Sequence, residues 1–327
     1  MRALVTGGGG FLGRFIVERL RAQNDDVTVL ARGSYPDLER LGVRCERGDI
    51  ADRAAVRKAC EGRDTVFHVA ARVGFAGSRE DFWAANVAGT DNVLEACREA
   101  GVRKLVFTSS PSVIFDGRDQ AGLDESTPYP ASFLALYPET KAESERRVLA
   151  ANGIGGLTTT ALRPHIIFGP RDASLLPRLV DRARRGQLLQ VGDGSNLVDV
   201  VYVENAAEAH VQAAASNEVA GKAYFVTQGQ PVRLWDFIGG LLKRLGLPGV
   251  RARIPFSAAY ALGAASEATY RALGLAGEPR ITRFLACELA HSHYYSIERA
   301  RRDFGYTPRV SIAEGLDRLA AWWKTQQ

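Results

Sequence analysis

The amino end of the chain is an apolar segment that runs directly into a glycine-rich turn. Residues 2–6 are Arg-Ala-Leu-Val-Thr, and the four residues that follow are all glycine. Beyond the turn, the apolar side chains change to the spacing of a helix, with Leu12, Phe15, Ile16 and Leu20 on one face. The glycines therefore lie between a strand and a helix, which excludes most interpretations of the run as a flexible loop.

This turn has the spacing of a dinucleotide site. Gly7 can adopt a backbone geometry that a side chain would forbid, Gly10 lets a pyrophosphate approach the main chain, and Gly13 lets the helix pack close to the strand. The first N–H groups of the helix and its dipole would then attract the phosphates. The pattern predicts cofactor contacts at Gly7, Gly10, Phe11, Leu12 and Gly13.

The same alternation of strand and helix continues along the first half of the chain. Apolar strands are predicted at 27–30, at 65–71 and at 103–110, and a further strand is predicted to end at 48–50. A helix is predicted over 79–100. Such a pattern predicts an α/β fold of the Rossmann type, a doubly wound parallel sheet. Beyond Gly169 the alternation breaks down. We therefore expect a dinucleotide-binding domain over 1–169 and a smaller substrate-binding domain over most of 170–327, with about 197–227 returning to the sheet.

The residues after the second strand predict which cofactor binds. An NAD enzyme usually has an acidic residue there, but this chain has Ala-Arg-Gly-Ser at 31–34. Without the carboxylate a 2′-phosphate is not repelled, and an arginine fork can bind it. The sequence favours NADP(H) over NAD(H), with contacts at Arg32 and Ser34; Arg14 is a second candidate, and a solvated surface charge is the alternative for each arginine. Ala70 and Ala71 would leave room for the ribose.

A tyrosine and a lysine are spaced four residues apart at Tyr137 and Lys141, after the fifth strand, which ends in serines. Ten tyrosines in this chain give about 0.2 such pairs by chance, and this is the only one. A phenol needs about 4 kcal/mol of differential stabilisation to titrate near pH 7, and an exposed lysine at i+4 supplies only about 0.3–0.5 kcal/mol. The pair can act as an acid or base only in a dry site. There, the Lys141 ammonium and an oxidised nicotinamide would favour the phenolate.

These motifs together resemble the extended branch of the short-chain dehydrogenase/reductase superfamily. The resemblance implies that Tyr137 transfers the proton, that Lys141 holds the ribose, and that Ser110 bonds the substrate oxygen, with Ser109 and Ser112 as alternatives. It also places an acid, here Asp49 beside Ile50, near the adenine. The segment 162–170 resembles the one that closes over the nicotinamide; its predicted cofactor contacts are Pro164, Ile166 and Ile167.

A finer resemblance is to the 3β-hydroxysteroid-dehydrogenase-like group. Residues 32–37, 86–92 and 192–196 look most like bacterial 2-alkyl-3-oxoalkanoate reductases of olefin synthesis, with sterol-4α-carboxylate 3-dehydrogenases as relatives. The implied reaction moves hydride between nicotinamide and the 3-carbon of a bulky apolar β-keto acid. Alternatives are a sterol or 3β-hydroxysteroid dehydrogenase, a nucleotide-sugar epimerase or dehydratase, which usually keeps the missing acid, and a non-catalytic NADP-sensing protein, which commonly loses the tyrosine and lysine.

Composition narrows the remaining classes of function. Hydrophobic residues make up 46% and charged residues 24%, with no apolar run near the ~20 residues of a membrane span. Four scattered cysteines predict reduced thiols in the cytoplasm and no metal site. The net charge of +5 comes from dispersed arginines, which argues against binding of nucleic acid.

A homodimer is implied only by the resemblance. Helix 254–275 is expected to pack on its own domain, to cover an apolar substrate or to touch a membrane or partner.

Two polar residues inside apolar segments have alternative interpretations. His68 lies in the fourth strand, and we expect a hydrogen-bonded core histidine rather than a base. Asn86 could brace neighbouring strands or, by the family resemblance, order the catalytic groups.

Overall fold

A seven-stranded parallel sheet forms the centre of the protein. The computed structural model describes residues 1–74, 77–275, 277 and 279–326. The strand order is β12-β7-β5-β4-β1-β2-β3, and every neighbouring pair is parallel. The strands are β1 (Arg2–Thr6), β2 (Asp26–Ala31), β3 (Arg44–Arg47), β4 (Thr65–His68), β5 (Lys104–Thr108), β7 (Thr158–Pro164) and β12 (Lys222–Val226). This is the predicted Rossmann-type fold, and the order reverses between β1 and β4.

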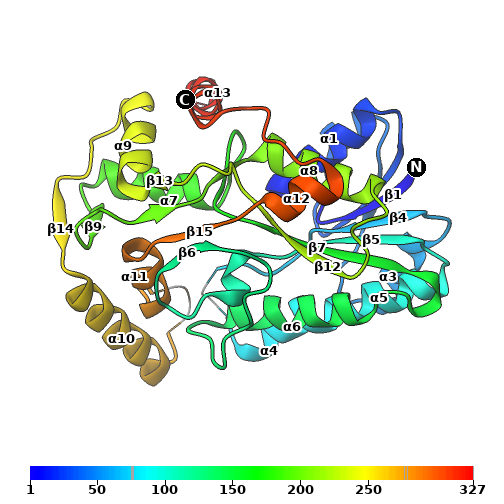
Figure 1. Cartoon of the computed structure of the whole chain (residues 1–327), viewed down its shortest axis with the longest axis horizontal. Helices are drawn as coiled ribbons and strands as arrows, with labels where there is room; N and C mark the ends of the chain where they lie inside the picture. Colours follow the sequence, from blue (N-terminus) through cyan, green and yellow to red (C-terminus); the bar gives the residue numbers. More distant parts are fainter. Residues whose placement is uncertain (75–76, 276, 278, 327) are drawn as a thin grey trace.

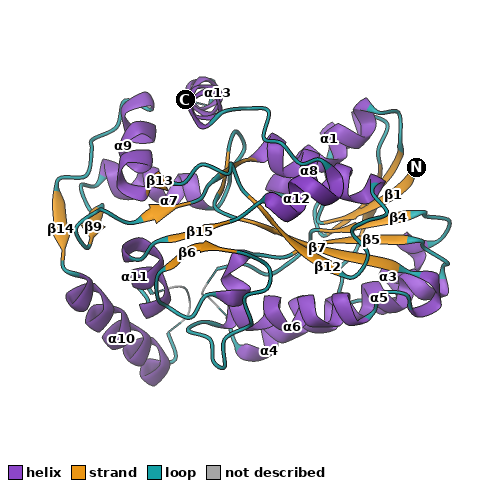
Figure 2. Cartoon of the chain, in the orientation of Figure 1, coloured by secondary structure: helices purple, strands orange, loops and turns teal. Residues whose placement is uncertain are grey.

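Helices cover both faces of this sheet (Figures 1 and 2). One face carries α1 (Phe11–Ala22) and α8 (Val203–Ala215); the other carries α3 (Arg53–Cys60), α5 (Gly89–Glu99) and α6 (Leu136–Ala150). Side chains of β1 alternate between the layers, because Ala3 and Val5 join the core under α1 and α8 whereas Leu4 joins the core under α3 and α5. Burial on both faces explains why the central strands β1, β4 and β5 are mostly apolar, whereas the edge strand β3 is polar and partly exposed.

Smaller sheets lie beside the carboxyl end of the central one. A four-stranded sheet has the order β13-β10-β15-β6, and the pairs β11-β8 and β14-β9 stand alone. The strands are β6 (Gln120–Leu123), β8 (Ile167–Phe168), β9 (Leu189–Val191), β10 (Leu197–Val198), β11 (Val201–Tyr202), β13 (Val232–Arg233), β14 (Ala252–Ile254) and β15 (His293–Tyr295). Because β6 comes from the middle of the chain, this sheet joins segments that are far apart in sequence.

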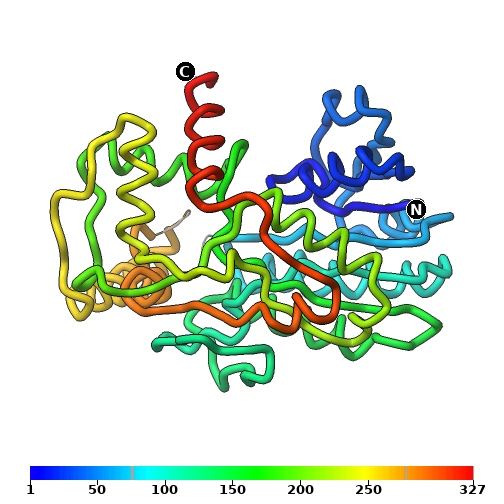
Figure 3. The backbone as a smooth tube through the Cα atoms, turned by 45° about the horizontal axis from the view of Figure 1, so that its top comes forward, coloured from blue at the N-terminus to red at the C-terminus, as the bar shows by residue number. Residues whose placement is uncertain are grey.

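The remaining helices surround these small sheets or connect strands. They are α2 (Pro36–Arg40), α4 (Arg79–Phe82), α7 (Leu175–Arg184), α9 (Leu234–Arg244), α10 (Phe256–Leu273), α11 (Arg283–Ala290), α12 (Glu298–Phe304) and α13 (Ile312–Lys324), with short 3₁₀ turns η2 (Pro111–Ile114) and η3 (Ile154–Gly156). In the turned view, α13 is the red helix that ends the chain, and it packs on α9 (Figure 3).

Two local predictions differ from the structure. Residues 197–203 were expected to form one strand that returns to the central sheet, but they form β10 and β11 in two small sheets, and only β12 joins the central sheet. Asp199 lies between them, buried, and its carboxylate accepts a hydrogen bond from the backbone of Tyr295 at 2.7 Å, so that the chain turns around a polar group. The helix over 79–100 exists, but its middle is a π-helical segment, η1 (Trp83–Ala88).

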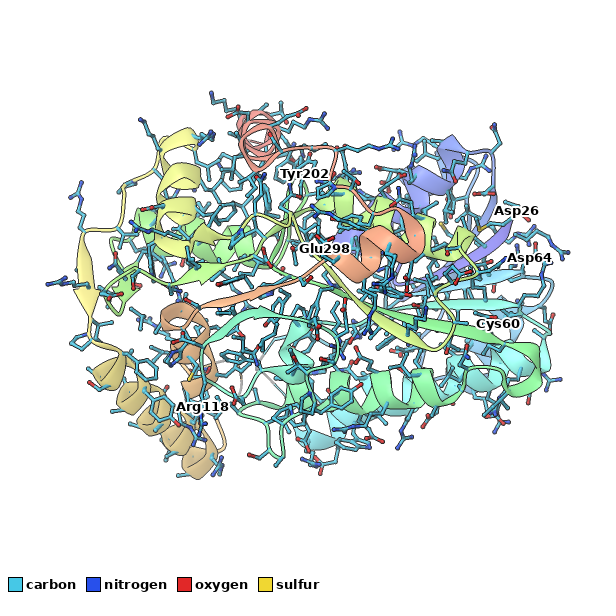
Figure 4. All side chains as sticks on the ribbon, viewed as in Figure 1. Asp26, Cys60, Asp64, Arg118, Tyr202 and Glu298 are labelled. Atoms are coloured by element: carbon cyan, nitrogen blue, oxygen red, sulfur yellow. The ribbon has the colours of Figure 1, made fainter. Side chains whose placement is uncertain are left out.

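The amino edge of the sheet is closed by surface ion pairs. Figure 4 labels Asp26 and Asp64 at this edge, next to the start of β2 and β4. Arg2 donates to Asp64 through Nη2 at 2.8 Å and Nε at 3.2 Å, and these hydrogen bonds lower the pKa of Asp64 to about 2. The carboxyl edge, by contrast, is open, and the candidate site lies there.

Candidate active site

A cleft of about 700 Å³ runs along the carboxyl edge where the strand order reverses. Fifteen of the sixteen residues predicted to bind the cofactor line it: Gly7, Gly10, Phe11, Leu12, Gly13, Arg32, Asp49, Ile50, Ala70, Ala71, Tyr137, Lys141, Pro164, Ile166 and Ile167. Ser110 and Ser109 line it as well. The cleft thus brings together strand ends and helix starts that are spread over more than 150 residues of sequence.

The glycine turn leaves no room for side chains but leaves helix donors open. Gly7 has a φ of +69°, and a Cβ there would lie 2.8 Å from the backbone nitrogen of Ala70. A Cβ on Gly13 would lie 2.3 Å from the carbonyl oxygen of Gly7. Helix α1 starts after Gly10 without a side-chain cap and without an acid in its first turn. Its first N–H groups are available to an anion, so the residues present fit a dinucleotide pyrophosphate.

The segment after β2 differs in detail from the sequence prediction. The side chain of Arg32 is 83% exposed, and its Nη1 lies 4.0 Å from Asp49 Oδ2. Ser34 is not among the described residues that line the cleft, and Arg14 forms an ion pair with Asp37. Tyr35, which was not among the residues predicted from the sequence, lines the cleft.

Tyr35 covers the glycine turn. A Cβ on Gly9 would lie 2.0 Å from its Cζ, and one on Gly33 would lie 2.8 Å from its hydroxyl oxygen. The two glycines that do not belong to the fingerprint were the available signal, because they make room for this ring.

Ser110 and Tyr137 meet at the inner end of the cleft. Tyr137 lies in the first turn of α6, Lys141 lies one turn later, and Ser110 follows β5 and bonds to the Tyr137 hydroxyl. Ser112 Oγ donates to Ser110 Oγ at 2.9 Å, which leaves the Ser110 proton to point toward Tyr137. Ser109, only 3% exposed, lies against Glu145 instead. The geometry favours Ser110 among the three serines and gives Ser112 a supporting position.

Burial dominates the electrostatics of this pair. It raises the pKa of Tyr137; the hydrogen bond from Ser110 opposes this shift, and the negative charge of Glu288 adds to it. Burial also lowers the pKa of Lys141 to about 7, against the opposing attraction of Glu145. The Lys141 ammonium donates to the carbonyl of Thr108 and lies 4.0 Å from the centroid of the Phe107 ring. Burial therefore favours the neutral phenol of Tyr137, and the stabilisation of its phenolate by Lys141 together with an oxidised nicotinamide stays a prediction.

Glu145, one turn after Lys141 on α6, forms a buried ion pair with Arg163 of β7. Glu145 accepts from Arg163 Nε at 3.0 Å and from the Tyr129 hydroxyl at 2.7 Å. Both charged side chains are almost fully buried, and each lowers the cost of burying the other. Because Arg163 holds Glu145, the carboxylate attracts Lys141 without forming a direct bond that would pull the ammonium away from the cleft.

The structure shows the hydrogen-bond partners of His68 and Asn86, the two polar residues for which the sequence allowed alternative roles. His68 is hydrogen-bonded on both sides, with Nδ1 2.8 Å from Thr6 Oγ1 and Nε2 3.0 Å from Thr90 Oγ1. Burial, followed by repulsion from Lys141, lowers its pKa to about 3. It is a neutral core histidine, as expected. Asn86 braces the segment after β4, since its amide accepts from Arg72 N at 2.7 Å and donates to Arg72 O at 3.0 Å.

Another part of the cleft is lined by the end of β7 and the residues that follow it. Ile166 has a φ of +39°, which is rare for a β-branched residue and costs on the order of 1–3 kcal/mol. The surrounding contacts hold this strained conformation, and Ile166 lines the cleft together with Pro164 and Ile167. Strain of this kind is common where a ligand must be approached closely.

Comparison with known proteins identifies the family. Residues 4–256 match the model of the 3-beta hydroxysteroid dehydrogenase/isomerase family. The chain belongs to this family. A 2-alkyl-3-oxoalkanoate reductase of Stenotrophomonas maltophilia (strain K279a) is 49% identical over 98% of this chain and 99% of its own length, and one of Shewanella oneidensis is 46% identical over 98% and 85%. A mouse sterol-4-alpha-carboxylate 3-dehydrogenase is 37% identical over 97% and 89%. The protein is therefore an oxidoreductase of the extended short-chain dehydrogenase/reductase type.

Solved structures support the same fold. MoeE5 in complex with UDP-glucose and NAD superposes with a TM-score of 0.78 at 25% identity, covering 100% of this chain and 99% of that one. UDP-glucose 4-epimerase of Thermotoga maritima has a TM-score of 0.79 at 21% identity over 100% and 99%. Enzymes of this family depend on a nicotinamide cofactor. In the described part of the chain no helix has the length and apolar character that crossing a bilayer requires.

Proposed function

We propose that the protein reduces the 3-oxo group of a bulky apolar 2-alkyl-3-oxo acid with NADPH. The observation that carries the proposal is that Ser110, Tyr137 and Lys141 line the same cleft as the glycine turn, with Ser110 hydrogen-bonded to Tyr137. The relatives named 2-alkyl-3-oxoalkanoate reductase, which match almost the whole chain, support the substrate class.

The residues of the site divide the chemistry between them. When bound, the cofactor supplies a hydride to carbon 3 of the substrate. The Ser110 hydroxyl donates a hydrogen bond to the substrate oxygen as negative charge develops there, and the Tyr137 phenol gives that oxygen its proton. One hydride and one proton convert the ketone to a secondary alcohol. A phenol whose pKa is raised by burial is protonated at neutral pH, which suits a proton donor in the reducing direction.

Lys141 has a different task in this proposal. Its ammonium lies at the cleft beside Thr108, where it can bond the ribose hydroxyls and hold the nicotinamide end in place. Bound hydroxyls and the attraction of Glu145 would both favour the charged form of Lys141. The same charge then stabilises Tyr137 when the phenol has given up its proton.

The preference for NADPH rests on the end of β2. No acid follows the strand, and the exposed Arg32 guanidinium lines the cleft where a 2′-phosphate would lie. Asp49 at 4.0 Å is close enough to orient Arg32 without neutralising it fully in water. Arg32→Gln should raise the KM for NADPH about 10-fold and leave that for NADH within about 2-fold. Equal effects on both cofactors would contradict the preference.

The alternative reactions make different demands on the same site. A sterol or 3β-hydroxysteroid dehydrogenase is supported by the 37% identical relatives and would use the same three residues in the oxidising direction. A nucleotide-sugar epimerase or dehydratase is less favoured because the acid after β2 is missing. A non-catalytic NADP-sensing protein is least favoured because Tyr137 and Lys141 are both present in the cleft.

A substrate panel tests the proposal. The protein is mixed with each cofactor and with 2-alkyl-3-oxo acids, hydroxysterols or sugar nucleotides, and the absorbance of the reduced cofactor is followed. We expect turnover of the 2-alkyl-3-oxo acid with NADPH, and a loss of about 10²- to 10⁴-fold in kcat for Tyr137→Phe at unchanged NADPH affinity. No oxidation of NADPH above the Tyr137→Phe background would overturn it.

A further inference from the structure

A second cavity of about 760 Å³ lies beside the cofactor cleft. Its walls come from α4, from residues 133–136, and from α10 and the start of α11. Phe82, Phe133, Leu134 and Leu136 supply apolar surface. Arg72 is, among the residues that the structure describes, the one that lines both this cavity and the cofactor cleft. It therefore marks the junction between them.

Hydrogen bonds fix the position of the Arg72 backbone relative to α6, the helix that carries Tyr137. Asn86 makes two hydrogen bonds to the Arg72 main chain, and its Nδ2 also lies 3.0 Å from Thr140 Oγ1 on α6. Thr140 stands between Tyr137 and Lys141 in sequence. Asn86 is buried and belongs to the π-helical segment η1, a distortion that is frequent at functional sites. The fold thus fixes the origin of the Arg72 side chain relative to the proposed proton donor.

The Arg72 side chain reaches over an apolar surface toward the junction. Its guanidinium carbon lies 5.3 Å from the centroid of the Phe82 ring, its Nη2 lies 3.7 Å from Asp81 Oδ2, and the side chain is 38% exposed. A guanidinium fork matches the two oxygens of a carboxylate, and a partly desolvated position strengthens that bond.

The acids that line the second cavity do not oppose an incoming anion. Glu139 is bonded by Arg79 at 2.9 and 2.8 Å, and Glu267 is bonded by Arg283 Nε at 2.8 Å. Each carboxylate is neutralised by its own arginine. The far wall carries a further cation, Arg271 on α10.

We propose that Arg72 binds the carboxylate of the substrate at the junction, and that the second cavity receives an alkyl chain. This inference rests on the proposed function. In a 3-oxo acid the carboxyl carbon is two bonds from the carbonyl carbon that is reduced, so one anchor at the junction can present carbon 3 to Tyr137 while the apolar chain leaves in the other direction. Arg72 would select acids over neutral ketones of the same shape.

The experiment compares an acid with its methyl ester in wild type, Arg72→Gln and Arg72→Lys. The stable 2-alkyl-3-hydroxy acid and its ester are offered with NADP⁺, and KM and kcat are measured for both. We expect Arg72→Gln to raise the KM of the acid at least 10-fold and to change the kcat/KM of the ester less than 3-fold. Arg72→Lys should recover part of the acid affinity, because it keeps the charge without the fork.

Arg53→Gln is the matched control, since it removes the surface ion pair Arg53–Glu95, and neither of these two residues lines either cavity. It should preserve the wild-type preference for the acid. The inference is overturned if Arg72→Gln weakens acid and ester equally, if the wild type does not prefer the acid, or if Arg271→Gln alone abolishes that preference. Turnover of neither compound by the wild type, in both directions of reaction, would instead contradict the proposed function.

Discussion

The two cavities that meet at Arg72 are built in different ways. The cofactor cleft is made from the carboxyl ends of neighbouring parallel strands and from the helix starts that follow them. The second cavity is made from α4 and residues 133–136 on one side and from α10 and α11 on the other, and more than 100 residues of sequence separate the two sides. The first is a property of strand–turn–helix units, whereas the second exists only when distant segments pack together. Cofactor binding should therefore be sensitive to the local backbone and substrate binding to the packing of these helices.

The charges of the two cavities differ as well. Lys141 and Glu145 in the cofactor region are buried, and burial lowers the pKa of Lys141 to about 7. The ion pairs of the second cavity, Arg79–Glu139 and Arg283–Glu267, are partly exposed to solvent. A buried charge strongly affects the free energy of unfolding, whereas an exposed ion pair contributes only about 0–1 kcal/mol to it.

The largest effect is expected from a methyl group in the glycine turn. Gly13→Ala places a Cβ 2.3 Å from the carbonyl oxygen of Gly7, so the turn must shift. Such overpacking costs about 1–3 kcal/mol, and we expect the Kd of NADPH to rise about 10- to 100-fold by fluorescence titration. Gly239→Ala in α9, where a Cβ would meet nothing within 4 Å, is the control and should bind NADPH as the wild type does. Equal affinities in both variants would refute the close fit of the turn.

A smaller effect is expected from the buried charge of Lys141. Its pKa is about 7 in the folded chain and 10.5 in the reference state, so between these values the unfolded chain binds the additional proton. The free energy of unfolding therefore rises with pH between these two pKa values. Below the lower value, Lys141 is charged in both states and the full cost of burying the ammonium is present. From pH 7 to 9, the free energy of unfolding of the wild type should gain about 1–3 kcal/mol relative to Lys141→Met in urea titrations of the cofactor-free protein. Lys58→Met, at an exposed position, should show no such change; a flat difference for Lys141→Met would mean that the ammonium is well solvated.

The smallest effect is expected from the apolar wall of the second cavity. Phe133→Ala removes part of the surface that an alkyl chain would cover, so the KM of a long-chain 2-alkyl-3-oxo acid should rise about 5-fold. A short-chain analogue should be affected less than 2-fold, and the Kd of NADPH should not change. An equal rise in KM for the long-chain and the short-chain substrate would mean that the alkyl chain does not bind in the second cavity.

Sequence alone determined the parts of this protein that depend on local chain geometry. The strand, the glycine turn and the helix at residues 2–22 specify the cleft, and parallel strands bring Ser110 and the start of α6 to the same edge. The family, the sheet and fifteen of the residues that line the cleft follow from these motifs. Ser34 is not among the described residues that line the cleft, whereas Tyr35 is, and no periodicity in the sequence indicates that the Tyr35 ring covers the glycine turn.

Tertiary structure decided what depends on contacts between distant segments. The split of residues 197–203 into two strands accompanies a buried carboxylate that accepts a hydrogen bond from the backbone of residue 295, and the raised pKa of Tyr137 follows from burial that outweighs the hydrogen bond from Ser110. The position of Arg72 is set by an amide from a π-helical segment, and the second cavity is set by helices near the end of the chain. Burial and long-range packing are sums over many side chains, so a local pattern of residues does not contain them.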